Sequence, residues 1–105
     1  MAQFDVFENP NRSTRDLVPY VLDVQSALIE QLATRLVMPL SRVGSGVTHL
    51  PGNLCPMVEV RGERLVLMPH LAAPIPLRLL REPVAGFSHL ASDICAAMDA
   101  VLSGY

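Results

Sequence analysis

The fold class of this chain is decided by residues 55–68, which read CPMVEVRGERLVLM. Two apolar runs of strand length, over residues 55–60 and 65–68, flank a short polar stretch that contains Gly62. Such runs, separated by a few residues with a glycine among them, predict two strands joined by a tight hairpin, here at residues 61–64. The middle of the chain is therefore expected to consist of short paired strands.

Further segments on both sides of the hairpin have the length and apolar content of strands. Residues 3–7 are the clearest example, because Phe4 and Val6 fall on one face and Asp5 on the other. The other candidate strands are residues 18–25, 35–40 and 75–80. The predicted loops and turns are residues 8–16, 26–34 and 42–53. Pro19, near the start of its segment, indicates a sheet edge or a bulge.

The C-terminal segment is predicted to form the one clear helix. Ser88 is a good N-cap residue, Asp93 lies where the helix dipole favours a negative charge, and Gly104 stands where a helix would end. An apolar stripe at steps of three and four residues comprises Leu90, Ile94, Ala97, Met98, Val101 and Leu102. Five to seven short strands followed by one helix predict a single α+β or small-barrel domain over residues 1–105.

Composition narrows the class of function. The formal net charge is −2, which argues against a surface devoted to phosphate backbones, and all eight basic residues other than histidine are arginine. No stretch has the length or apolar character of a signal peptide or a membrane helix, so a cytoplasmic location is expected. His49, His70 and His89 have no metal-site spacing, and no common catalytic motif is present.

Two pairs of residues can be interpreted in more than one way. Cys55 and Cys95 are forty positions apart, and two buried reduced thiols are expected rather than a disulfide. Asp23 and Arg35 are candidates either for a buried ion pair or for an ordinary surface pair. Composition and spacing do not decide between these interpretations.

An ordered series of motifs runs along the chain. DVQS at residues 23–26 is followed by LIE at 28–30 and RLVMPL at 35–40, then by LCPMVEV at 54–60, MPHLAAPIP at 68–76 and LREPV at 80–84. Together with the final Gly104 and Tyr105, this series resembles the CcdB family of plasmid and chromosomal toxins over essentially the whole chain. The resemblance implies a small SH3-like, strongly bent antiparallel sheet, with a small accessory sheet and one C-terminal helix.

The resemblance also implies a function. CcdB-type toxins of type II toxin–antitoxin systems act in plasmid maintenance as cytoplasmic homodimers without enzymatic activity or a cofactor. They bind the A subunit of DNA gyrase, trap gyrase on cleaved DNA, and are neutralised by a CcdA-like antitoxin, without specific binding to nucleic acid themselves. The residues implied in gyrase binding are Leu28, Ile29, Asp99, Leu102, Ser103, Gly104 and Tyr105. Those implied in antitoxin binding are Glu8, Asn9, Asn11, Arg12, Ser13, Pro56 and Glu59. Those implied in the dimer interface are Met68, His70, Leu71, Ala72 and Ala73.

Two alternatives stay open, and the first follows from one departure from the family pattern. Well-known members carry a tryptophan at the position of Ser103, so this chain is either a toxin that uses Tyr105 in its place or a non-toxic chromosomal relative. The other alternative is a MazF-like endoribonuclease, which shares the fold class and would use Arg12, Arg15 and Arg35 on single-stranded RNA. The slightly acidic composition and the order of the motifs favour the gyrase-binding toxin.

Overall fold

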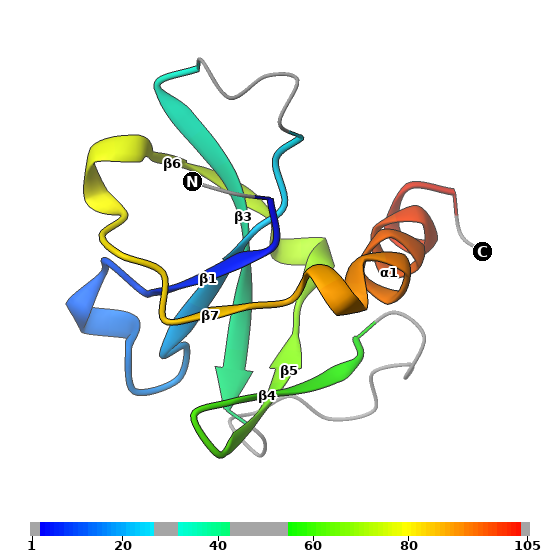
Figure 1. Ribbon diagram of the computed structural model, residues 1–105, viewed down its shortest axis with the longest axis horizontal. Helices are drawn as coiled ribbons and strands as arrows, with labels where there is room; N and C mark the ends of the chain where they lie inside the picture. Colours follow the sequence, from blue (N-terminus) through cyan, green and yellow to red (C-terminus); the bar gives the residue numbers. More distant parts are fainter. Residues whose placement is uncertain (1–2, 27–31, 43–54, 104–105) are drawn as a thin grey trace.

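The computed structural model describes residues 3–26, 32–42 and 55–103. In these ranges, seven strands form one connected antiparallel sheet and one α-helix follows them (Figure 1). The strands are β1 (Asp5–Glu8), β2 (Tyr20–Asp23), β3 (Thr34–Arg42), β4 (Met57–Val60), β5 (Glu63–Leu67), β6 (Ala73–Pro76) and β7 (Ala85–Gly86). The helix is α1 (Ala91–Ser103), and the short 3₁₀ turns are η1 (Arg12–Thr14), η3 (Pro69–Leu71), η4 (Leu77–Leu79) and η5 (Ser88–Leu90).

The long strand β3 organises the sheet. The strand order is β4-β5-β3-β2-β1-β7, and β6 also pairs with β3. Along one edge, β3 pairs with β6 over Thr34–Val37 and then with β5 over Leu40–Arg42. This change of partner bends the sheet strongly, nearly into a barrel, so the predicted α+β, SH3-like class is confirmed. Among the described residues, the β4–β5 hairpin pairs with the main sheet at the end of β3.

Pro39 lies in the middle of β3, a place that prolines normally avoid because they lack a backbone N–H. Its carbonyl accepts a hydrogen bond from the Met68 N–H at 3.0 Å, so the backbone of Pro39 faces the side of β5 and β6. Pro39 falls between the residues that pair with β6 and those that pair with β5. The missing N–H therefore lies where β3 changes partner, and its absence removes no backbone hydrogen bond from the pairing of β3 with β5 or with β6.

The predicted hairpin is confirmed, with slightly shifted strands. Arg61 and Gly62 form its two-residue turn, and both have positive φ, 51° and 82°. Two successive residues with positive φ are the signature of a type I′ turn, whose twist matches that of the flanking strands. The glycine at the second position accepts this conformation without steric cost. The strands are Met57–Val60 and Glu63–Leu67 rather than residues 55–60 and 65–68.

The central strands are covered on both faces, which explains why they contain nearly continuous apolar runs. The face toward α1 carries the larger core, whose buried residues include Val6, Leu22, Met38, Leu40, Leu65, Leu67 and Ile94. The opposite face carries a smaller core of Phe7, Val21, Val37 and Leu80, with Ile75 packed against it. Both faces of the sheet thus carry a hydrophobic core, and the face opposite α1 is only partly covered.

The start of the helix differs from the prediction. Ser88 is not the N-cap, because it lies inside η5, and the preceding Phe87 makes no side-chain cap hydrogen bond. The Phe87 carbonyl instead accepts from the Leu90 N–H at 2.8 Å, which closes the 3₁₀ turn before α1 begins at Ala91. The predicted strand over residues 75–80 is also wrong, since the strand is Ala73–Pro76 and the chain then turns through η4.

Only part of the predicted helical stripe is core. Ile94 and Ala97 are buried and Met98 packs against the main core. Val101 and Leu102 belong to the last turn, and Leu102 is 77% exposed. Cys95 is exposed because it follows Ile94 on the helix and so faces away from the core, whereas Cys55 is buried as expected. Both cysteines are free.

Candidate functional site

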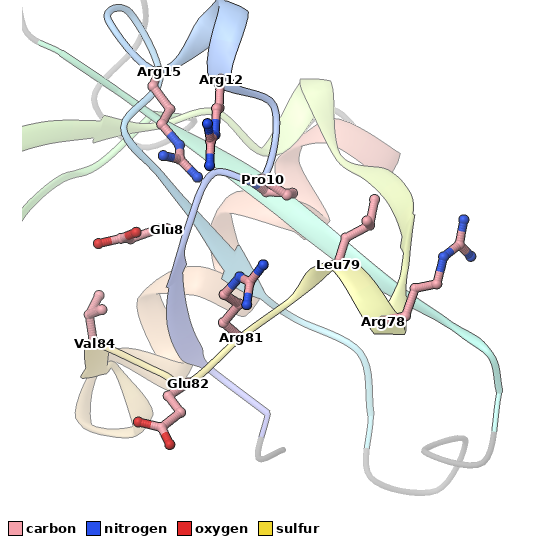
Figure 2. A pocket seen from close by; sticks show the side chains of 9 residues that line it. All are labelled: Glu8, Pro10, Arg12, Arg15, Arg78, Leu79, Arg81, Glu82 and Val84. Carbon is pink, nitrogen blue, oxygen red and sulfur yellow. The ribbon is translucent and has the colours of Figure 1, made fainter.

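A cationic hollow of about 680 Å³ opens at one end of the sheet (Figure 2). Four of the eight arginines of the chain line it. Arg12 and Arg15 come from the loop that contains η1, Arg78 from η4, and Arg81 from the segment just after η4. Figure 2 shows Arg12 and Arg15 side by side, Arg12 and Arg81 pointing toward each other from opposite walls, and Arg78 directed away at the rim.

The loop that carries Arg12 and Arg15 is held by two asparagines. The side-chain amide of Asn9 donates to Thr14 Oγ1 and to the Val18 carbonyl, both at 2.8 Å, and its Oδ1 accepts from the backbone N–H of Asn11 at 3.0 Å. Asn11 then caps η1 by accepting from the Ser13 N–H at 3.1 Å. These local hydrogen bonds take the place of regular strand pairing in the loop, and they fix the backbone from which Arg12 and Arg15 project.

The charge of the hollow is positive. Glu8 and Glu82 also line it, so four guanidinium groups stand against two carboxylates. Glu8 lies 3.8 Å from Arg61, an exposed residue outside the hollow. Within the described ranges, neither Arg12, Arg78 nor Arg81 has a carboxylate oxygen within 4 Å. Positive charges that gather without partners attract anionic groups to this end of an otherwise slightly acidic protein.

An apolar groove of about 440 Å³ adjoins the cationic hollow. Residues from the less covered face of the sheet, including Val21, Val37, Pro39 and Ile75, line much of it. Pro10 and Leu79 line both the groove and the hollow, so the two depressions lie next to each other. The resulting surface offers cationic groups at one end and apolar contacts at the other.

The residues implied in antitoxin binding lie partly on this surface. Glu8 and Arg12 line the hollow, while Asn9 and Asn11 line the groove and also hold the loop. Ser13 is exposed beside them and its hydroxyl donates to Asn11 Oδ1. Pro56 and Glu59 line neither depression, because Pro56 directly precedes β4 and Glu59 lies within it.

The bend of the sheet brings the β4–β5 hairpin close to the end of β1. Arg61, in the hairpin turn, approaches Glu8 to 3.8 Å.

The sequence alone did not identify Arg78, Leu79 and Arg81 as site residues. The only signal for them was their clustering shortly after Pro76. The sequence places them far from Arg12, and the fold brings them to it.

The residues implied in gyrase binding lie at the end of α1 where the structure describes them. Asp99, Leu102 and Ser103 are all exposed, and Leu102 is the most exposed large apolar residue of the described ranges. Ser103 Oγ donates to the Asp99 carbonyl at 2.6 Å, which holds the last helical turn closed. Leu28, Ile29, Gly104 and Tyr105 lie outside the described residues.

The residues implied in the dimer interface lie in and around η3. His70, Leu71 and Ala73 are exposed, Ala72 is half-buried against the main core, and Met68 is buried in a small cluster with Cys55 and Val66. Leu71 and Ala73 also line the apolar groove. Cys55 Sγ lies 3.9 Å from His70 Nδ1, but burial raises the pKa of the Cys55 thiol, which disfavours the reactive thiolate.

A buried ion pair removes Arg35 from any shared site with Arg12 and Arg15. Arg35 Nη2 lies 2.8 Å from Asp23 Oδ2, and the two side chains are 2% and 0% exposed. The first of the two interpretations of this pair is therefore correct, and the trio invoked for a ribonuclease does not come together. The described residues hold no group of three or more potential metal ligands. They also contain no helix long and apolar enough to cross a membrane.

The chain matches a known protein family. The model of the family described as "CcdB protein" covers residues 3–104, nearly the whole chain.

Proposed function

Because the chain belongs to the CcdB family of gyrase-poisoning toxins, we propose that it binds the A subunit of DNA gyrase and traps gyrase on cleaved DNA. The observation that carries the proposal is the combination of the nearly full-length family match with an exposed apolar end on the one α-helix of the described residues. In this proposal the protein acts by stoichiometric binding in the cytoplasm, as a homodimer, and catalyses no reaction itself.

The helix end is suited to a long-lived complex. Ile94 and Ala97 anchor α1 on the sheet, while Leu102 projects from its last turn. A contact residue on an anchored helix loses little conformational freedom on binding, so more of the burial energy is available for affinity. Full burial of a leucine side chain contributes about 1.5–3 kcal/mol, which corresponds to roughly a tenfold to hundredfold change in Kd.

The proposal includes a CcdA-like antitoxin that neutralises the toxin. The positively charged hollow supports this part, because it offers a partner a surface separate from the end of α1 and from Leu71. Homodimerisation through η3 is supported by Leu71, which is about half exposed in the protomer and would be buried by a second copy.

The experiment combines purified chain with gyrase, ATP and supercoiled plasmid. We expect linear DNA to accumulate after protein denaturation. In a separate binding titration, we expect Leu102→Ser to reduce affinity for the gyrase A dimerisation fragment by about tenfold or more. Leu17→Ser is the matched control, since Leu17 is also an exposed leucine but lies away from α1. Absence of binding to the fragment at micromolar concentration, by a chain with native circular dichroism, would overturn the proposal.

A host test separates this function from the two alternatives. Induction of the gene should arrest wild-type cells and spare cells with a gyrase A allele resistant to CcdB. Death in both hosts, with cleaved transcripts, would indicate a ribonuclease, and growth of both would indicate a non-toxic relative.

A further inference from the structure

We propose that a cavity between α1 and the sheet captures small apolar α,β-unsaturated carbonyl compounds, with the Cys95 thiol at its edge forming the covalent bond. The cavity has a volume of about 130 Å³. Of the described residues that line it, none belongs to the sets implied in gyrase, antitoxin or dimer contacts. The cavity is therefore a further site, separate from the surfaces described above.

The first step of the inference is the apolar lining of the cavity. Phe4, Leu36 and Ile94 contribute to this lining, and the described part of it includes no charged side chain. Gln3 also lines the cavity, but its Nε2 donates to the Val24 carbonyl at 3.1 Å. A charged ligand would lose its hydration there, whereas an apolar group gains by leaving water. Apolar cavities of about 150 Å³ bind benzene, so this cavity suits an apolar group of about that size.

The second step is the position of the thiol. Cys95 is free and exposed, yet it also lines the cavity. It follows the buried Ile94 and precedes Met98 by three residues, which places it on the flank of α1 where the cavity meets solvent. The thioethers of Met38 and Met98 also line the cavity, and sulfur packs favourably against π systems. A ligand that reaches the thiol from solvent therefore has apolar and polarizable side chains beside it.

The third step is the chemistry of capture. The Cys95 sulfur, as the thiolate, adds to the β-carbon of the unsaturated carbonyl compound. A carbon–sulfur bond forms while the carbon–carbon π bond breaks, and the proton that the thiol released to water is returned at the α-carbon. The addition needs no oxidant or reductant. Binding of the apolar group in the cavity before the bond forms raises the rate, because the reacting atoms are then held close together.

The test measures, by mass spectrometry with peptide mapping, how fast two maleimides modify the full chain. N-propylmaleimide and N-(2-hydroxyethyl)maleimide carry the same reactive ring and tails of nearly the same size, but only the propyl tail is apolar. Each rate is divided by the rate of the same reagent with glutathione, which corrects for intrinsic reactivity. We expect the corrected rate at Cys95 to be about tenfold higher for N-propylmaleimide, because its tail gains from burial in the cavity.

Matched controls separate the cavity from a general preference of thiols for apolar reagents. Cys95→Ser/Ala96→Cys moves the thiol by one residue, to an exposed position of α1 outside the described lining, and should react equally with both reagents. Met98→Phe fills part of the cavity and should abolish the preference at Cys95. Met57→Phe makes the same change at an exposed methionine outside the described lining and should leave the preference intact. Circular dichroism checks that each variant is folded, and the Ala96→Cys variant tests the site even if Met98→Phe does not fold.

Three results would overturn the inference. Equal corrected rates of the two reagents at Cys95 would show that the cavity takes no part in the reaction. The same preference in Cys95→Ser/Ala96→Cys would show that any thiol on α1 favours apolar reagents. A preference that persists unchanged in folded Met98→Phe would show that the tail binds elsewhere.

A consequence for partner binding rests on the proposed function. Cys95, Asp99 and Leu102 are exposed and follow one another at steps of four and three residues, so they lie on one face of α1. Labelling of Cys95 with N-propylmaleimide should therefore weaken binding of the gyrase A dimerisation fragment by about tenfold or more. Equal affinity of the labelled and unlabelled chains would contradict this consequence alone. If the unlabelled chain does not bind the fragment, the proposed function fails, whereas the maleimide rates still decide whether the cavity is a site.

Discussion

Replacing Asp23 by asparagine should cost this protein a large part of its stability, although the new side chain has nearly the same size. Asp23 is fully buried and its carboxylate accepts from Arg35 Nε at 2.9 Å and from the Gln25 N–H at 2.9 Å. The Arg35 side chain also donates to the Gln25 carbonyl at 3.3 Å. Gln25 Oε1 in turn accepts from the Leu36 N–H at 3.0 Å, so this network joins the end of β2 to the start of β3.

The magnitude follows from the charge that is left behind. Asp23→Asn removes the counter-charge of Arg35 but leaves the Arg35 side chain, which is 2% exposed, in its buried place. Removing one partner of a buried ion pair typically costs about 3–5 kcal/mol. Small proteins unfold with a free energy of about 5–15 kcal/mol, so the variant should be marginal. With a urea slope of about 2 kcal/mol/M, a loss of about 4 kcal/mol lowers the unfolding midpoint by about 2 M.

The assay is urea unfolding followed by circular dichroism at one fixed protomer concentration, because dimerisation makes stability concentration-dependent. The control is Arg42→Gln at the other end of β3, which breaks an exposed pair with Glu63 of β5, at 2.6 Å, and should cost at most about 1 kcal/mol. The double variant Asp23→Leu/Arg35→Met should recover most of the loss, since it leaves no buried charge unpaired. If Asp23→Asn costs no more than Arg42→Gln, the reasoning from burial is refuted.

Four further predictions concern the turn, the two thiols and the helix. Gly62→Ala should lower the free energy of unfolding by about 1 kcal/mol through its φ of +82° alone, because nothing lies within 4 Å of the added Cβ; Gly86→Ala, without a positive φ, should cost less, and equal losses in urea melts would contradict this. Iodoacetamide should modify Cys95 in the native protein and Cys55 only after unfolding, as read by mass spectrometry. Burial raises the pKa of the Cys55 thiol in the folded state. The stability that the protonated thiol contributes should therefore be complete below its unfolded pKa, about 8.5, and be lost as pH rises through the folded pKa. If a Cys55→Ala variant loses stability with rising pH as steeply as the wild type, Cys55 is not the cause of the loss. Ala97→Leu should destabilise by about 1–3 kcal/mol in a thermal melt, since Ala97 is fully buried on the core-facing side of α1, and an unchanged melting temperature would show unfilled space there.

Some features of this protein were determined by short stretches of sequence. The hairpin turn could be predicted because Arg61 and Gly62 need positive φ, a property of the local backbone that glycine accepts. The existence of the helix could be predicted from its apolar stripe, since Ile94 and Ala97 fall on one face by helical geometry alone. The family could be recognised because its ordered motifs extend along nearly the whole chain.

Other features required the tertiary structure. The sequence left Asp23 and Arg35 as either a buried or a surface pair, and only the packing of β2 against β3 removed both from water. Val101 and Leu102 continue the apolar stripe, yet burial ends before them, because burial depends on what lies opposite a residue and not on its spacing. The meeting of Arg12 with Arg81 depends in the same way on how distant elements pack. Local backbone preferences act between neighbours in sequence, whereas which side chains share a surface depends on how the sheet bends where β3 changes partner.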